Sequence, residues 1–114
     1  MSLKTGSRQV NGITIVDLNG RIVLGEATTA LRELLQNLAS QGQKQILLNL
    51  AEVSYIDSSG LGALVSGYTT LAGQQGNLKL LNLTKKVQDL LQITKLLTVF
   101  EVYNDEATAV QSFR

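Results

Sequence analysis

The sequence predicts an α/β fold with a mixed central β-sheet, an N-terminal β-hairpin and about four helices. Three observations lead to this prediction. Short apolar segments alternate with amphipathic segments of about ten to sixteen residues, which is typical of strands joined by helical crossovers. The segments 45–50 and 78–83 show little polar alternation, as expected for parallel strands covered on both faces. The first apolar segments instead flank Asn11-Gly12, a dipeptide typical of tight hairpins, which makes the sheet mixed.

The first part of the chain is predicted to form a hairpin, a short strand and a helix. Asn11-Gly12 readily supplies the positive φ angles of the hairpin turn. Gly20 and Gly25 then bracket the apolar sequence RIVL, which predicts another short strand. An amphipathic helix is expected over about 26–41, ending near Gly42, because leucines recur there at three- and four-residue spacing. These leucines are Leu31, Leu34, Leu35 and Leu38.

The middle of the chain is predicted to form a buried strand followed by a helix. The strand is the segment 45–50. The helix begins near Ser58 and ends within 73–76, where glycines are suited to a helix terminus. One face of this helix is apolar and consists of Leu61, Leu64, Val65, Tyr68 and Leu71.

The last part of the chain is predicted to contain two more strands and two more helices. The segment 78–83 is a second buried strand, and Thr84 is a possible cap for the helix after it. That helix would bury Val87, Leu90 and Leu91. The sequence TVFEVY predicts the last strand. A final helix, capped by Asn104 or Asp105, would bury Ala107 and Val110.

Length, composition and charge limit the classes of protein. A chain of 114 residues with 44% apolar residues is expected to form one domain over 1–114. The net charge of +1, with no basic run, predicts no direct binding to nucleic acid or to a membrane surface. No apolar run approaches the roughly 18 residues needed to span a bilayer, and no hydrophobic signal segment is seen. We therefore expect a cytoplasmic protein whose partner is another protein or a small molecule.

The chain contains neither cysteine nor histidine. It therefore lacks a thiol nucleophile, thiolate metal ligands, and the commonest general base and metal ligand in proteins. From this composition we expect no enzymatic activity, no metal and no cofactor.

The sequence YIDSSGLGAL at positions 55–64 places a carboxylate, two hydroxyls and two glycines at the start of a helix. A serine nucleophile is not favoured, because without histidine only a lysine or a carboxylate could act as its base. Asp57 alone is too weak a base for that role. The Gly-x-Ser-x-Gly pattern of a nucleophile elbow is also absent, since Ile56 stands where its first glycine belongs.

Nucleotide binding is disfavoured by two broken glycine patterns. Gly60 and Gly62 begin a Gly-x-Gly-x-x-Gly pattern, but Val65 replaces its third glycine. Gly62 and Gly67 have the spacing of a P-loop, yet a tyrosine and a threonine follow where lysine and Ser/Thr must contact phosphate and Mg²⁺.

Asp57 or Ser58 is expected to cap the helix, since both side chains accept hydrogen bonds from free N–H groups of a first turn. Capping does not explain the glycines, each of which costs roughly 1 kcal/mol in a helix relative to alanine. The face opposite the apolar one is small and nearly uncharged. Either another protein's backbone approaches this face, or it packs against a neighbouring helix of the same chain. It consists of Ser59, Gly62, Ala63, Ser66, Gly67, Thr69, Thr70 and Gly73.

The sequence NLAEVSYIDSSGLGALVSGY, set after a buried strand, resembles the signature of the STAS domain (sulphate transporter and anti-sigma factor antagonist). The similarity extends over essentially the whole chain, including NGRIVLGEATTALRELL, QQGNLKLLNL, VQDLLQITKL and DEATAV. It is strongest to free-standing bacterial anti-anti-sigma factors. One departure is that many members carry acidic residues at the places occupied here by Arg21 and Val23.

The resemblance implies a single STAS-like domain that works as a phosphorylation-switched binding module. Unmodified, it would bind an anti-sigma factor that is also a serine kinase, and so release a sigma factor. Phosphorylation of Ser58 would end that binding, and a serine phosphatase would restore it. The alternative is a STAS subunit of another assembly, such as a stress-signalling complex or a lipid-transport ATPase. The implied partner-binding residues are Asp57, Ser58, Ser59, Gly60, Gly62, Ala63, Ser66 and Gly67.

Overall fold

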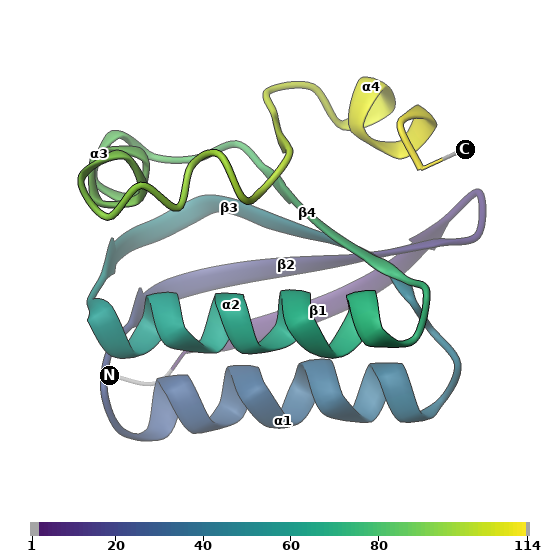
Figure 1. Cartoon of the computed structure of the whole chain (residues 1–114), viewed down its shortest axis with the longest axis horizontal. Helices are drawn as coiled ribbons and strands as arrows, with labels where there is room; N and C mark the ends of the chain where they lie inside the picture. The colour runs from purple at the N-terminus through teal and green to yellow at the C-terminus, as the bar shows by residue number, and fades with distance from the viewer. Residues whose placement is uncertain (1–2, 114) are drawn as a thin grey trace.

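The computed structural model of the chain describes residues 3–113 and contains a five-stranded sheet with the order β1-β2-β3-β4-β5, which is also the order of the strands along the sequence (Figure 1). The strands alternate with helices after the first hairpin. The elements are β1 (Lys4–Val10), β2 (Ile13–Ile22), α1 (Glu26–Ser40), β3 (Gln45–Ile56), α2 (Ser58–Gly73), β4 (Asn77–Leu81), α3 (Lys85–Ile93), β5 (Val102–Tyr103) and α4 (Glu106–Gln111).

The predicted mixed sheet is confirmed. β1 pairs antiparallel with β2 across Asn11 and Gly12, which adopt φ angles of 51° and 82° as the turn requires. The pairs β2–β3, β3–β4 and β4–β5 are all parallel. The parallel strands therefore end at one common edge of the sheet, where their connections to the helices lie.

Four strand predictions were wrong in their bounds. The segment predicted as a strand over 78–83 is β4 over Asn77–Leu81, which ends before Asn82 because that residue takes a left-handed φ of 57°. RIVL is not a separate strand, because β2 continues through Gly20 to Ile22 and pairs with β3 across a register shift beside Gly20. β3 extends to Ile56, six residues beyond the predicted end, since β2 covers its added length. Only two residues of TVFEVY form β5, because Phe100 leaves the sheet plane and packs into the core.

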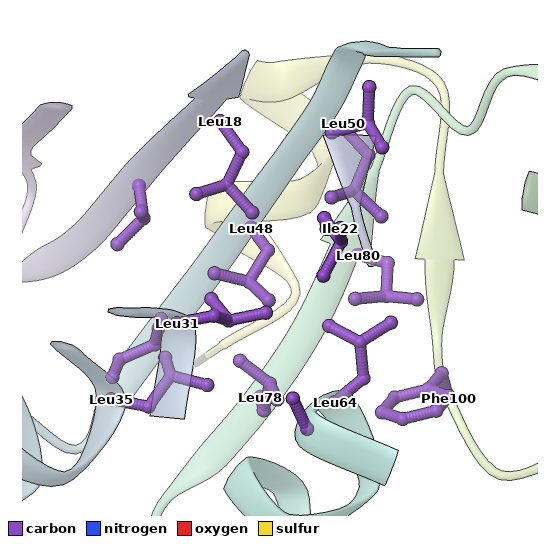
Figure 2. Close-up of a cluster of buried hydrophobic side chains, with 14 of the residues drawn as sticks. Leu18, Ile22, Leu31, Leu35, Leu48, Leu50, Leu64, Leu78, Leu80 and Phe100 are labelled. Atoms are coloured by element: carbon purple, nitrogen blue, oxygen red, sulfur yellow. The ribbon is translucent and has the colours of Figure 1, made fainter. Parts of the chain in front are cut away.

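The main core lies between the sheet and the side-by-side helices α1 and α2 (Figure 1). Figure 2 shows leucines and isoleucines of β2, β3 and β4 meeting side chains of both helices. Burial of these apolar side chains is the main stabilising term of the fold. The residues labelled there are Leu18, Ile22, Leu31, Leu35, Leu48, Leu50, Leu64, Leu78, Leu80 and Phe100.

A smaller apolar cluster lies beneath α4, on the other face of the sheet. Val110 is buried there as predicted, but Ala107 is exposed and Ala109 is buried in its place. The predicted cap is confirmed, since Asp105 precedes the helix and accepts a hydrogen bond from Thr108 N–H at 2.9 Å. The cluster consists of Ile13, Ile15, Leu47, Leu81, Ala109 and Val110.

Hydrogen bonds and ion pairs also connect the α4 region to the sheet. Lys79 of β4 is only 6% exposed, and its ammonium group donates to the backbone oxygen and the hydroxyl of Ser112 at 2.9 and 3.0 Å. The same ammonium lies 3.2 Å from a carboxylate oxygen of Glu101. On the surface, Arg8 of β1 forms an ion pair with Glu106 of α4 at 2.6 Å. The buried lysine is thus paired and hydrogen-bonded, as a buried charge must be.

The helix α3 begins after Thr84, as predicted, but not with the predicted contact. The Thr84 hydroxyl donates to the backbone oxygen of Val53 at 3.0 Å and makes no hydrogen bond to the first turn of α3. Val87 and Leu91 are buried and Leu90 is half-buried. Over residues 3–113, none of the helices has the length and apolarity needed to cross a membrane.

Candidate functional site

Ser58 is the first residue of α2 and lies at the edge where the parallel strands end. Its side chain is exposed, whereas Ser59 in the next position is half-buried. The step from β3 to α2 occupies a single residue, Asp57. The two ends of this short connection are fixed by secondary structure, so the position of Ser58 at the surface is well determined.

Asp57 is the helix cap. One carboxylate oxygen accepts a hydrogen bond from Gly60 N–H at 2.9 Å, and the other accepts one from Leu24 N–H at 2.9 Å. These backbone donors, that of Leu24 first, hold the pKa of Asp57 below its ordinary value because they favour the ionised carboxylate. Asp57 therefore joins the β2–α1 loop to the start of α2 and leaves the Ser58 hydroxyl without a capping role.

Gly60 is required by a close backbone approach. A Cβ atom at this position would lie 2.3 Å from the backbone oxygen of Ile22 and 2.6 Å from a side-chain carbon of Ile56. Because no side chain fits at such distances, only glycine allows the first turn of α2 to approach the end of β2 this closely.

Gly67 and Ala63 allow α2 to pack tightly within the domain. A Cβ atom at Gly67 would lie 2.5 Å from Leu35 of α1, and Ala63 is 0% exposed. Three of the residues predicted to contact a partner, Gly60, Ala63 and Gly67, are therefore buried within the domain. Their small size serves the packing of α2 against its own neighbours, which is the second interpretation of the small face.

The outer side of α2 carries Gly62, Ser66 and Thr69 of the predicted small face, together with Ser58 at the start of the helix. Ser58 and Thr69 are exposed, and Gly62 and Ser66 are half-buried. These four residues, which we call the α2 ridge, carry no charge, and α2 contains no charged residue at all. Solvent-facing helix surfaces usually carry charges, so an uncharged ridge is typical of a surface that contacts another molecule. The Arg32 guanidinium of α1 flanks the ridge, 3.3 Å from where a Cβ of Gly62 would lie.

Leu24 was missed by sequence reasoning. Its side chain is 78% exposed, although its backbone N–H is fixed by the Asp57 carboxylate. The sequence placed Leu24 in a strand between two glycines, and a strand residue would be expected to face either core or solvent. In the structure β2 ends at Ile22, and Leu24 belongs to the loop before α1. Gly25 in the same loop has a φ of 116°, which favours glycine, so its residue type was the sequence signal for this loop. This hydrogen bond places the exposed leucine near Asp57, the residue before Ser58, and so enlarges the candidate site.

Within the part of the chain that the structure describes, residues 3–113, no three carboxylates gather to bind an ion. The Asp57 carboxylate is already engaged by two N–H groups. The arrangement suits contact with a protein surface better than chemistry on a small molecule.

A family model described as the STAS domain matches residues 6–109. The chain belongs to the STAS domain family. It is 33% identical to the anti-sigma-B factor antagonist of Bacillus subtilis over 111 residues, which cover 97% of this chain and 100% of that protein.

The fold of this STAS domain is also shared with solved structures. An anti-sigma factor antagonist from Mycobacterium paratuberculosis superimposes with a TM-score of 0.84 at 19% identity, covering 98% of this chain and 94% of the other. The Bacillus cell fate determinant SpoIIAA in its phosphorylated form gives a TM-score of 0.76 at 22% identity, covering 97% and 100%. At these identities the likeness shows the fold alone, and it confirms the predicted α/β architecture.

Proposed function

We propose that this STAS domain is an anti-sigma factor antagonist that phosphorylation of Ser58 switches off. The observation that carries the proposal is the exposed Ser58 hydroxyl on the first turn of a helix whose cap is Asp57. The name of the Bacillus subtilis relative supports it, as does a SpoIIAA structure in the phosphorylated form. Those relatives also disfavour the alternative of a STAS subunit in another assembly.

In the unmodified state, the domain binds an anti-sigma factor that is also a serine kinase, and thereby frees a sigma factor. The partner contacts the α2 ridge, Leu24 and the polar residues Asp57 and Ser59 at the helix start. The ridge offers a smooth surface without charges to desolvate, and Leu24 offers apolar area that becomes buried on binding.

In the modified state, the kinase has transferred the γ-phosphoryl group of ATP to the Ser58 oxygen, which loses its proton. The group adds about −1.5 to −2 of charge at a helix N-terminus, where the dipole tolerates an anion, so the fold persists. A docking partner, however, must desolvate this dianion beside the ionised Asp57 or supply new cations, and binding weakens. A serine phosphatase reverses the change.

Catalysis by the domain itself does not form part of this function. Asp57, the carboxylate adjacent to Ser58, has its oxygens engaged by the N–H groups of Leu24 and Gly60. The Ser58 hydroxyl therefore has no base poised to activate it, and the domain acts as a substrate of the kinase and as a ligand of the anti-sigma factor.

The test is calorimetric titration of the cognate anti-sigma factor with four proteins: unmodified, kinase-treated, Ser58→Ala and Ser58→Asp. Peptide mass spectrometry should find the phosphoryl group on Ser58. Kinase-treated protein and Ser58→Asp should bind at least about tenfold more weakly, which corresponds to 1.4 kcal/mol. Ser58→Ala should bind in the presence or absence of ATP.

Ser59→Ala is the matched control, because it removes a neighbouring hydroxyl and should leave both phosphorylation and its effect unchanged. Modification confined to Ser59, or tight binding by the phosphorylated protein, would refute the proposed switch.

A further inference from the structure

A groove of about 300 Å³ is lined by residues at the end of β3 and in the helix α3. The end of β3 is also the edge of the sheet at which α2 starts (Figure 1). Its walls are mostly apolar, and Ile93 at its rim is 77% exposed. Isolated exposed apolar residues are common, but here several adjoin one another in a concave surface. The lining residues are Tyr55, Ile56, Lys86, Asp89, Leu90 and Ile93.

Two cations lie over the aromatic ring at one end of this groove. The Arg21 guanidinium carbon is 5.3 Å from the centre of the Tyr55 ring, and the Lys86 ammonium is 6.0 Å from it. Arg21 is the cross-strand partner of Tyr55, so the sheet itself fixes this pair. The acidic residue of the groove, Asp89, forms an ion pair with Lys85 at 3.2 Å. The cations Arg21 and Lys86 therefore give the groove a net positive charge.

One end of the groove lies close to Ser58. Tyr55 precedes Ser58 by three positions, so their Cα atoms are at most about 11 Å apart. An interface of standard size buries about 800 Å² on each protein, equivalent to a disc about 32 Å across. A partner centred on Ser58, at the edge of the sheet that the start of α2 and the groove share, would cover both features.

We propose that this groove is a second part of the partner site and that it binds a segment of the anti-sigma factor in which an apolar side chain is flanked by carboxylates. The apolar side chain fills the space beside Ile93 and Leu90, and the carboxylates pair with Arg21 and Lys86. Charge complementarity identifies the acidic character of the segment, since two cations would otherwise lose hydration without compensation. This inference rests on the proposed function and adds the chemistry of the partner to it.

The positive charge of the groove also explains why phosphorylation should weaken binding of an acidic partner. The two cations attract an acidic partner, whereas a phosphoryl group on Ser58 adds a charge of similar size and opposite sign at the same edge. The modified protein therefore loses the attraction as well as gaining a dianion to desolvate. Because the cations are exposed at the groove rim, the association rate should fall as salt concentration rises.

The test is a measurement of association and dissociation rates for the anti-sigma factor at low and high salt. Arg21→Glu and Lys86→Glu should each slow association about tenfold at low salt and flatten its salt dependence. Ile93→Ser should instead speed dissociation. Lys44→Glu is the matched control: it makes the same change in net charge at the start of β3, the opposite end of the strand, and should change association much less. Thermal melts of all variants verify that each remains folded.

The outcomes separate the two proposals. If Arg21→Glu, Lys86→Glu and Ile93→Ser all behave like Lys44→Glu while phosphorylation still weakens binding, the groove is not part of the site and the proposed function stands. If the groove variants weaken binding but phosphorylation does not, the switch is refuted and the groove stands. An unmodified protein that does not bind the anti-sigma factor refutes both.

Discussion

Three glycines in α2 occupy very different surroundings, and replacing each by alanine should change stability in a graded order. Alanine is favoured over glycine within a helix by about 1 kcal/mol, so each substitution begins with that gain. At Gly62 the added methyl group meets only the terminal nitrogen of Arg32 at 3.3 Å, which can move aside. Gly62→Ala should therefore raise the free energy of unfolding by up to about 1 kcal/mol.

The other two substitutions introduce overlaps that exceed this gain. At Gly67 the methyl group would lie 2.5 Å from Leu35, a side chain fully enclosed in the core. Overpacking of this kind costs about 1–3 kcal/mol, which leaves a net loss of about 1 kcal/mol after the helical gain. At Gly60 the overlap is with a backbone oxygen at 2.3 Å, and a strand end moves less readily than a side chain. Gly60→Ala should lose about 2 kcal/mol or more.

Urea titration and thermal melting of the purified variants would measure the order Gly62→Ala, parent protein, Gly67→Ala, Gly60→Ala, from most to least stable. For a domain of this size, 1 kcal/mol corresponds to about 4 °C in Tm. A Gly60→Ala variant as stable as Gly62→Ala would refute the close approach between β2 and α2, and with it the assignment of Gly60 to packing.

Three further changes have defined outcomes. The pKa of Asp57 is depressed in the folded state, so its contribution to stability is present above the unfolded value near pH 4 and lost as pH falls through the folded pKa. Asparagine still caps a helix, so urea titrations should show Asp57→Asn less stable than the parent at pH 7 only by the part of these hydrogen bonds that depends on the charge, and the two proteins should converge in acid. Lys79→Met removes the hydrogen bonds to Ser112, so amide exchange in α4 should accelerate while exchange in α1 stays unchanged; equal acceleration in both helices would contradict a local role. Arg8→Gln should cost about 1 kcal/mol or less, and the difference should shrink in high salt, because the ion pair with Glu106 is exposed.

The helices and the buried strands could be predicted because their signals are local. The leucine spacing of α1 and the apolar face of α2 depend on helix periodicity, and both helices appear close to their expected bounds. The ends of β2 and β3 could not be predicted, since they depend on how far each strand finds a partner. Gly20 illustrates the difference. A glycine predicts a break in a strand, but β2 continues beyond Gly20 because it still pairs with β3 there.

The site was predictable to a similar degree. Capping rules narrowed the cap to Asp57 or Ser58, and only the fold shows that it is Asp57, whereas the role of Ser58 stays a prediction from the signature motif. The role of Gly67 depends instead on Leu35, a residue of another helix. The groove combines Arg21, Tyr55 and α3, three segments whose proximity exists only in the folded chain.

The sequential order of the strands has a consequence for biosynthesis. Each new strand is added beside the one synthesised just before it, so the sheet can grow in step with translation and without waiting for distant segments. Every residue of the α2 ridge and of the groove precedes position 94, whereas β5 and α4 lie beyond it. A nascent chain that has left the ribosome as far as Ile93 therefore already carries the complete set of residues for partner contact. β5 and α4 are synthesised afterwards, and β5 adds the last strand beside β4.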